Sequence, residues 1–277
     1  RSCIARVLGR FARRTASDDV AEVFAVLLAD LVADDARKLL EKEAGSNRAD
    51  ATIETYLASI RLSDASKDVR AAQREKLEVI SQKMPDSAFV RYHLGRAYLA
   101  ESNLRAAAEQ FDRCVKLDSN YSPAWVALAE IELRAGNAPA AEMRASAVLR
   151  SNPAFLPAIM TKARAQIARG KAVDAARSLE QVLSIQPDNN DALFWLAGSH
   201  MARRDAAKAL TLLGQGKKRD GNNPRWLLAE TQALASTGKV PEARAQLEAA
   251  RRSENVTEEI LQNLASLQLA MRDGEAA

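Results

Sequence analysis

A 34-residue period is the strongest constraint on how this chain folds. Three segments that begin at Ser122, Leu156 and Asn190 align without a gap, so each starts one full period after the segment before it. The same register extends back to Ala88 and forward to Pro224 and Glu258. A period of this length is typical of arrays in which each repeat is one supersecondary unit that buries its apolar face against its neighbours.

Small residues recur at this period, as expected where helices cross in close contact. One column consists of Ala107, Ala141, Ala175, Ala209, Ala243 and Ala277. A second consists of Gly95, Ala129, Ala163, Ala197, Thr231 and Ala265. A third column holds Gly136, Gly170 and Gly238, where we expect a helix to end and the backbone to turn left-handed. The low aromatic content of 5% also favours thin, closely packed helices.

The eight prolines support units of helix, short turn and helix, because proline inside a helix costs about 3 kcal/mol or more. Second helices are expected to end near Pro85, Pro153 and Pro187. First helices are expected to begin near Pro123, Pro157 and Pro224. Pro139 and Pro241 are expected to open second helices, where the missing N–H would be unpaired anyway.

The residues at these positions resemble a known family. Leu94-Gly95-x-x-Tyr98, followed by Ala107 and Phe111, resembles the tetratricopeptide repeat of the bacterial type, as do Trp125-x-x-Leu128-Ala129, Ala141 and Pro153. The resemblance covers residues 88–277. It implies an all-α fold, a right-handed α-solenoid of antiparallel helix pairs (a tetratricopeptide superhelix). From Asn190 onward Gly216 and Gly221 depart from the pattern, so we expect a frayed or loosely packed second helix there.

The period also predicts how the chain is divided. Residues 88–277 are expected to form five complete 34-residue repeats and the first helix of a sixth. Residues 51–87 are predicted to be a divergent repeat, three residues longer, with an insertion around 63–67. Residues 1–50 are a divergent helical region, either degenerate repeats or a single capping helix at 18–44. We interpret the chain, which starts at Arg1 without Met, as part of a longer protein.

No combination of residues in the sequence indicates catalysis, so we predict no enzyme, no metal and no cofactor. The two histidines, His93 and His200, lack a neighbouring acid or second ligand and are expected on the surface or in a groove. Gly214-x-Gly216 is followed by Lys217 and Lys218, but a phosphate loop requires a preceding strand and a Ser or Thr after its lysine. Cys114 falls in a repeat column and is predicted to be a core residue.

Charge and hydropathy restrict the partners further. The net charge is +4, but the basic clusters at residues 1–16 and 217–219 lie far apart and lack neighbouring aromatics, which argues against nucleic acid. No apolar run approaches the roughly 18 residues that span a bilayer. Two cysteines fit either a cytoplasmic or a periplasmic, envelope-associated protein.

The resemblance implies that the first helices line a concave groove that binds a protein or peptide. The residues predicted to face this groove are Tyr56, Tyr92, His93, Arg96, Glu130, Met160, Arg164, Phe194, Met201, Arg225 and Gln232. Of the adjacent pair Phe194 and Trp195, we expect Phe194 to face the groove. The Lys, Asn and Arg that bind chaperone tails in some family members are missing, since Tyr92, Ala127 and Thr161 lie among the matching positions.

We therefore predict a non-catalytic scaffold or adaptor that holds a peptide or partner protein. The alternative is a targeting array of a larger enzyme, such as a glycosyltransferase, a kinase or a peptidase, whose catalytic domain lies outside this chain.

Overall fold

A computed structural model describes residues 51–62, 66–221 and 223–252, together with residues 258, 261–263, 265 and 266. These residues form helices and turns, and no strand occurs among them. The chain divides into two compact units, residues 1–131 and 132–277, which are described separately. The predicted N-terminal region 1–50 and Ala277 lie outside the described residues. The predicted repeat ranges stay a prediction.

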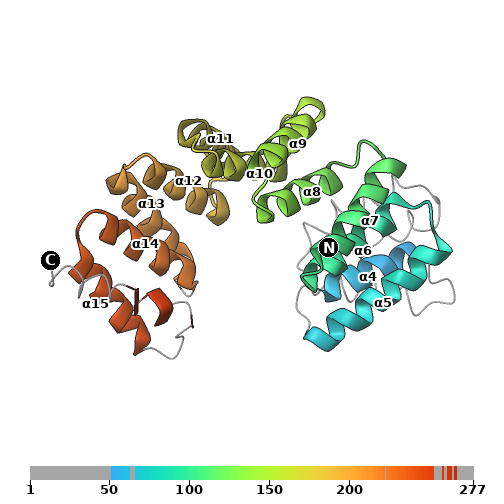
Figure 1. Cartoon of the computed structure of the whole chain (residues 1–277), viewed down its shortest axis with the longest axis horizontal. Coiled ribbons are helices and arrows are strands. Elements are labelled where there is room, and N and C mark those ends of the chain that lie inside the picture. The colour runs from blue at the N-terminus through green and yellow to red at the C-terminus, as the bar shows by residue number, and fades with distance from the viewer. Residues whose placement is uncertain are drawn as a thin grey trace, which may run out of the picture. The chain divides into compact units, whose positions relative to one another are not determined.

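The first helices of the repeats follow one another at the predicted spacing. They are α6 (Ala88–Ala100), α8 (Ser122–Arg134), α10 (Leu156–Ala168), α12 (Asn190–Ala202) and α14 (Pro224–Ser236). The second helices keep the same spacing. They are α7 (Leu104–Leu117), α9 (Ala138–Ser151), α11 (Ala172–Ile185), α13 (Ala206–Arg219) and α15 (Val240–Arg251). The predicted all-α solenoid of antiparallel helix pairs is thereby confirmed, and the pairs can be followed by their labels in Figure 1.

Each unit is built by packing a helix pair against the next pair. In the first unit α4 (Ala51–Arg61) and α5 (Lys67–Lys83) pack against α6, and α6 packs against α7. With 17 residues α5 is three residues longer than α7, which has 14. In the second unit α10 contacts α9, α11 and α12, and the contacts continue from α12 through α13 and α14 to α15.

Five turns between the first and second helices share one backbone conformation. Gly136, Gly170 and Gly238 have φ angles of 79°, 75° and 80°, as the glycine column predicts. Ser102 and Arg204 occupy the same column with φ angles of 60° and 61°. The sequence pattern did not predict a positive φ for these two residues, because glycine is the residue type that indicates a left-handed position. The turn is therefore imposed by the hairpin itself, and glycine relieves its strain without being essential to it.

Prolines and caps fix where the helices begin. Pro139, Pro157, Pro224 and Pro241 lie at the first or second position of their helices, as predicted. The side chains of Asn103, Asn137 and Asp205 accept a hydrogen bond from the backbone N–H three residues later and so cap second helices. Lys171 and Lys239 hold the equivalent positions without a side-chain cap.

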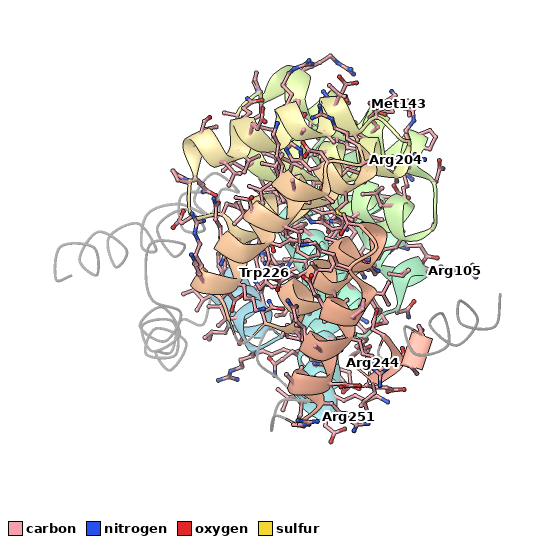
Figure 2. The ribbon with its side chains drawn as sticks, turned by 90° about the vertical axis from the view of Figure 1, so that its left-hand side faces the viewer. Arg105, Met143, Arg204, Trp226, Arg244 and Arg251 are labelled. Atoms are coloured by element: carbon pink, nitrogen blue, oxygen red, sulfur yellow. The ribbon has the colours of Figure 1, made fainter. Side chains whose placement is uncertain are left out.

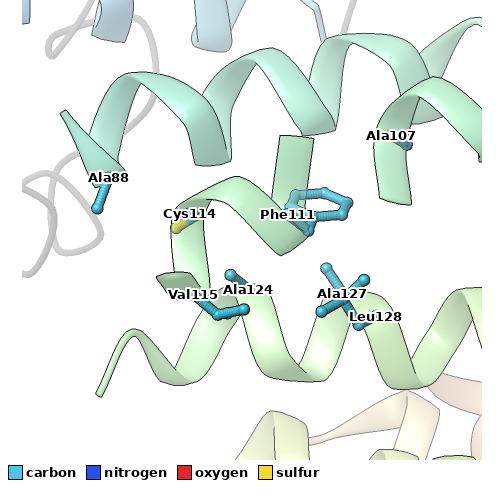
Figure 3. Close-up of a cluster of buried hydrophobic side chains, with 8 residues drawn as sticks. All are labelled: Ala88, Ala107, Phe111, Cys114, Val115, Ala124, Ala127 and Leu128. Atoms are coloured by element: carbon cyan, nitrogen blue, oxygen red, sulfur yellow. The ribbon is translucent and has the colours of Figure 1, made fainter. Parts of the chain in front are cut away.

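The core of each unit forms where the columns of small residues pack against large apolar side chains. The side chains of Ala107, Ala141, Ala175, Ala209 and Ala243 are all fully buried. In the first unit Phe111 is fully buried among Ala107, Cys114, Ala124 and Leu128, which gather between α6, α7 and α8 (Figure 3). A Cβ atom added to Gly95 would lie 2.5 Å from the Phe111 ring, so the glycine makes room for the phenylalanine. Cys114 is a core residue, as predicted.

The expectation of a frayed helix at Gly216 is wrong. Helix α13 continues through Gly216 to Arg219, and Gly216 itself is buried. The indole of Trp226 fills the space left by the missing side chain, because a Cβ atom at Gly216 would lie 2.3 Å from the ring. In the two preceding repeats the same pair of positions holds Val182 with Ala192 and Val148 with Ala158. Between α13 and α14 the large side chain therefore comes from the first helix of the following repeat, whereas in the two preceding repeats it comes from the second helix.

Candidate partner-binding face

Six of the residues predicted to line a groove lie on the first helices of the second unit. They are Met160 and Arg164 on α10, Phe194 and Met201 on α12, and Arg225 and Gln232 on α14. Gln232 is exposed, and the other five are half-buried. Half-burial means that each side chain is held by its neighbours while part of it remains accessible.

Two arginines and three aromatic rings in this unit form a continuous series of contacts. The Arg164 guanidinium lies 5.1 Å from the centre of the Trp195 ring. Trp195 meets Phe194 edge to face, with 5.6 Å between their ring centres. Arg225 lies 5.2 Å from Phe194 and 4.8 Å from Trp226. We refer to Arg164, Trp195, Phe194, Arg225 and Trp226 as the arginine–aromatic row.

An ion pair between repeats fixes Arg225 in this row. Its Nη1 atom donates to Asp191 on α12 at 2.5 Å, and the side chains of Arg225 and Asp191 are 30% and 65% exposed. Asp191 was missed by the sequence analysis. The signal available for it was an acid and a base separated by one repeat period, which places opposite charges at equivalent positions of adjacent repeats. Trp226 was missed as well, and it is fully buried.

The arginine–aromatic row consists of side chains that commonly bind partner proteins. Arginine and aromatic side chains dominate the energetic centres of protein interfaces, because they offer large area and directed donors at a small entropic cost. The stacking and the ion pair hold Arg225 in one geometry, so less side-chain freedom is lost when a partner binds. Phe194 also covers Trp226 of the following repeat, with 5.5 Å between their ring centres, and so contributes to packing.

In the first unit the predicted groove residues Tyr92, Arg96 and Glu130 differ in how far their side chains are exposed. Tyr92 is half-buried, and its ring centre lies 5.8 Å from Phe111 and 5.2 Å from Tyr121. Burial raises the pKa of the Tyr92 hydroxyl. Arg96 is exposed and donates from Nη1 to the Ser59 hydroxyl at 3.1 Å. Glu130 is half-buried on α8.

Two predicted groove residues, Tyr56 and His93, lie in the core instead. Each is only 6% exposed, and the His93 ring meets Phe89 and Tyr56 at centre distances of 4.4 and 5.6 Å. Burial, assisted by the charge of Arg96, lowers the pKa of His93 to about 3. The helical position next to Tyr92 turns toward the neighbouring repeat, where Ala127 and Thr161 are buried at equivalent places.

His200 was also expected to be accessible, and that expectation is wrong. It is 6% exposed, and its Nδ1 atom lies 3.3 Å from Asp205. Asp205 in turn caps α13, so this histidine is part of the packing at the turn between α12 and α13.

Two other kinds of feature are missing from the described part of the chain. Among these residues no group of three or more His, Cys, Asp or Glu side chains is arranged to hold a metal ion. None of the helices formed by the same residues is both long and apolar enough to span a bilayer.

Comparison with known proteins shows that the sequence matches tetratricopeptide repeat families. The family model described as protein kinase G tetratricopeptide repeat matches residues 16–193, and a tetratricopeptide repeat model matches residues 166–233. A TPR repeat-containing protein of Pseudomonas aeruginosa is 38% identical over 63 residues, 23% of this chain. That match spans 60% of the relative, so the chain covers less than two thirds of its length.

Solved structures share the fold at low identity. A tetratricopeptide repeat protein from Parabacteroides merdae superimposes with a TM-score of 0.65 and 12% identity, over 89% of this chain and 96% of that one. PilW, a type IV pilus biogenesis factor, superimposes with a TM-score of 0.68 and 16% identity, over 77% of this chain and 98% of that one.

Proposed function

Because the chain belongs to the protein kinase G tetratricopeptide repeat family, we propose that it is a non-catalytic array that binds a peptide or partner protein along its first helices. The arginine–aromatic row carries this proposal. It combines two half-buried rings on α12 and the fully buried ring of Trp226 with guanidinium groups on α10 and α14, and it is flanked by Met160 and Met201. Flexible thioether side chains beside rigid rings are common in surfaces that bind peptides.

The experiment compares capture of a partner by three variants. The purified chain retains a binding protein from a lysate of its source organism, and the retained protein is identified by mass spectrometry. Arg164→Ala and Gln232→Ala remove contact groups from the face while leaving the fully buried core unchanged. The matched control is Arg177→Ala, which removes an arginine that is 76% exposed on the second helix α11.

We expect Arg177→Ala to retain the partner and both face variants to release it, with all three proteins melting near the wild-type temperature. Equal retention by all three would place the contact elsewhere. A lower melting temperature for Arg164→Ala than for a core variant such as Ala175→Leu would assign Arg164 to the core.

A second function is favoured by one observation, the family model itself, whose description names protein kinase G. In this alternative the array recruits substrates or regulators for a kinase domain encoded in the same reading frame. The complete reading frame of the source gene distinguishes the two. A kinase domain joined to this array supports recruitment, and its purified full-length product would transfer phosphate from ATP to the captured partner. A frame without such a domain leaves the adaptor role.

A further inference from the structure

The turns that join first and second helices in the second unit lie along one edge of the helix pairs, which we call the turn edge. It comprises residues 169–171, 203–205 and 237–239, which follow α10, α12 and α14. The three turns are equivalent, because each centres on a residue with positive φ and the helices around them pack in sequence. Any groups that they carry are therefore repeated from one repeat to the next.

Cations on this edge outnumber the carboxylates that can neutralise them. Glu142 pairs with Arg169 and with Lys171, the latter at 3.3 Å. The remaining nearby acids are engaged too. Asp205 lies 3.7 Å from Lys208, Glu242 lies 3.7 Å from Lys239, and Asp174 lies 3.4 Å from Arg177.

Arg203 and Arg204 stand apart from this pattern. Both are exposed, and neither side chain forms a hydrogen bond or an ion pair with any residue of the described chain. Arg204, which Figure 2 labels, has a φ angle of 61° at the position where the neighbouring repeats have Gly170 and Gly238. An L-residue in this conformation costs roughly 1–2 kcal/mol relative to a helical one.

We propose that the turn edge is a second interaction surface that binds an extended acidic segment of a partner protein, with Arg203 and Arg204 as its centre. The proposal is separate from the arginine–aromatic row, which lies on the first-helix faces. Adjacent packed helices are about 8–10 Å apart, and an extended chain rises about 3.3 Å per residue. One repeat therefore corresponds to about three residues, so carboxylates spaced three residues apart would meet successive turns at Lys171, Arg203–Arg204 and Lys239.

A nucleic acid would also carry negative charge, but a peptide fits this edge better. Proteins that hold single-stranded nucleic acid place aromatic rings beside the basic groups so that bases stack on them. The turns at 169–171, 203–205 and 237–239 contain no aromatic residue.

The probe is a fluorescent synthetic peptide with Glu at every third position in a Gly/Ser background, and its affinity is measured by anisotropy at low and high salt. The key variant is Arg204→Gly, because glycine suits the left-handed turn and removes the charge without harming the fold. We expect it to bind the peptide about threefold more weakly while melting at a higher temperature, and Arg203→Ser with Arg204→Gly to lose roughly tenfold. The matched control, Lys218→Ala, removes one exposed positive charge from the last turn of α13, away from the turn edge, and should bind like the wild type.

Three outcomes would overturn the proposal. They are no binding of the Glu peptide by the wild type, equal affinities for Arg204→Gly and Lys218→Ala, and tighter binding of a single-stranded oligonucleotide of equal charge. Arg164→Ala distinguishes this surface from the row, because it should leave affinity for the Glu peptide unchanged even if it abolishes capture of the partner.

Discussion

At the scale of single residues, the left-handed turn provides a direct test of how the hairpins are built. Ser102 has a φ angle of 60° at the position that three other repeats fill with glycine. We expect Ser102→Gly to raise the free energy of unfolding by about 0.5–1 kcal/mol, because the relief of strain exceeds the extra freedom of glycine in the unfolded chain. Urea denaturation measures the change. Ser119→Gly, at an exposed turn position with an ordinary φ, is the control and should give no gain.

His93 makes the stability of the first unit depend on pH. The folded protein holds its pKa at about 3, whereas the unfolded chain protonates it near the usual 6.5. Protonation therefore favours unfolding. The stability that depends on a neutral His93 is complete above pH 6.5 and is lost as the pH falls from 6.5 toward 3, by about 1.4 kcal/mol per pH unit.

Replacing His93 by Phe should remove this dependence. The ring is surrounded by Phe89, Tyr92 and Tyr56, and its Nδ1 atom has no hydrogen-bond partner among the residues that the structure describes, so an apolar ring suits the site. We expect the wild type to lose roughly 2 kcal/mol more than His93→Phe between pH 7 and pH 5. The acidic groups shared by both proteins cancel in this difference, which urea denaturation at the two pH values provides. Identical losses would show that His93 protonates freely in the folded state.

At the scale of helices, the packing of Trp226 on α14 against Gly216 on α13 predicts that a larger residue at position 216 compensates for a smaller one at position 226. Trp226→Ala alone should cost about 3–5 kcal/mol, because it leaves a cavity beside Gly216. Gly216→Val alone should cost about 1–3 kcal/mol or more, because its side chain would collide with the indole.

The double variant recreates the combination seen as Val182 with Ala192, which pack together in the preceding repeat. It should therefore be more stable than Trp226→Ala. A double-mutant cycle by urea denaturation measures the coupling, and the control pair is Trp226→Ala with Ala138→Gly, whose positions lie far apart in sequence. Simple additivity for Gly216→Val and Trp226→Ala would contradict direct packing of the two residues.

The helices also show where sequence analysis succeeds and where it stops. The starts of α9, α10, α14 and α15 follow from local chemistry, since proline at a first turn and glycine before the next helix act within a few residues. The packing of Gly216 against Trp226 involves a residue in the following helix, so local pattern alone predicted a loose end that the fold does not have. Tyr56 and His93 were misplaced for a related reason, because a shift of one position turns a side chain about 100° around its helix.

At the scale of the whole molecule, the repeat period was sufficient to predict the all-α solenoid. Repeats contact only their neighbours, so one correct hairpin specifies the rest. The binding face was harder to predict, because it depends on which side chains remain accessible after packing. Asp191 and Trp226 became visible only through their contacts with Arg225.

Nearest-neighbour packing also predicts that damage stays local. Leu77 and Leu179 are fully buried at equivalent positions of α5 and α11, three repeats apart and in different units. Leu179→Ala should cost about 2–5 kcal/mol and lower the hydrogen-exchange protection of amides in α10, α11 and α12, while α4 and α6 keep their protection. Leu77→Ala is the matched variant and should give the reverse. If each variant lowered protection equally in all helices, the array would unfold as a single cooperative body, and stability would not be the sum of neighbouring contacts.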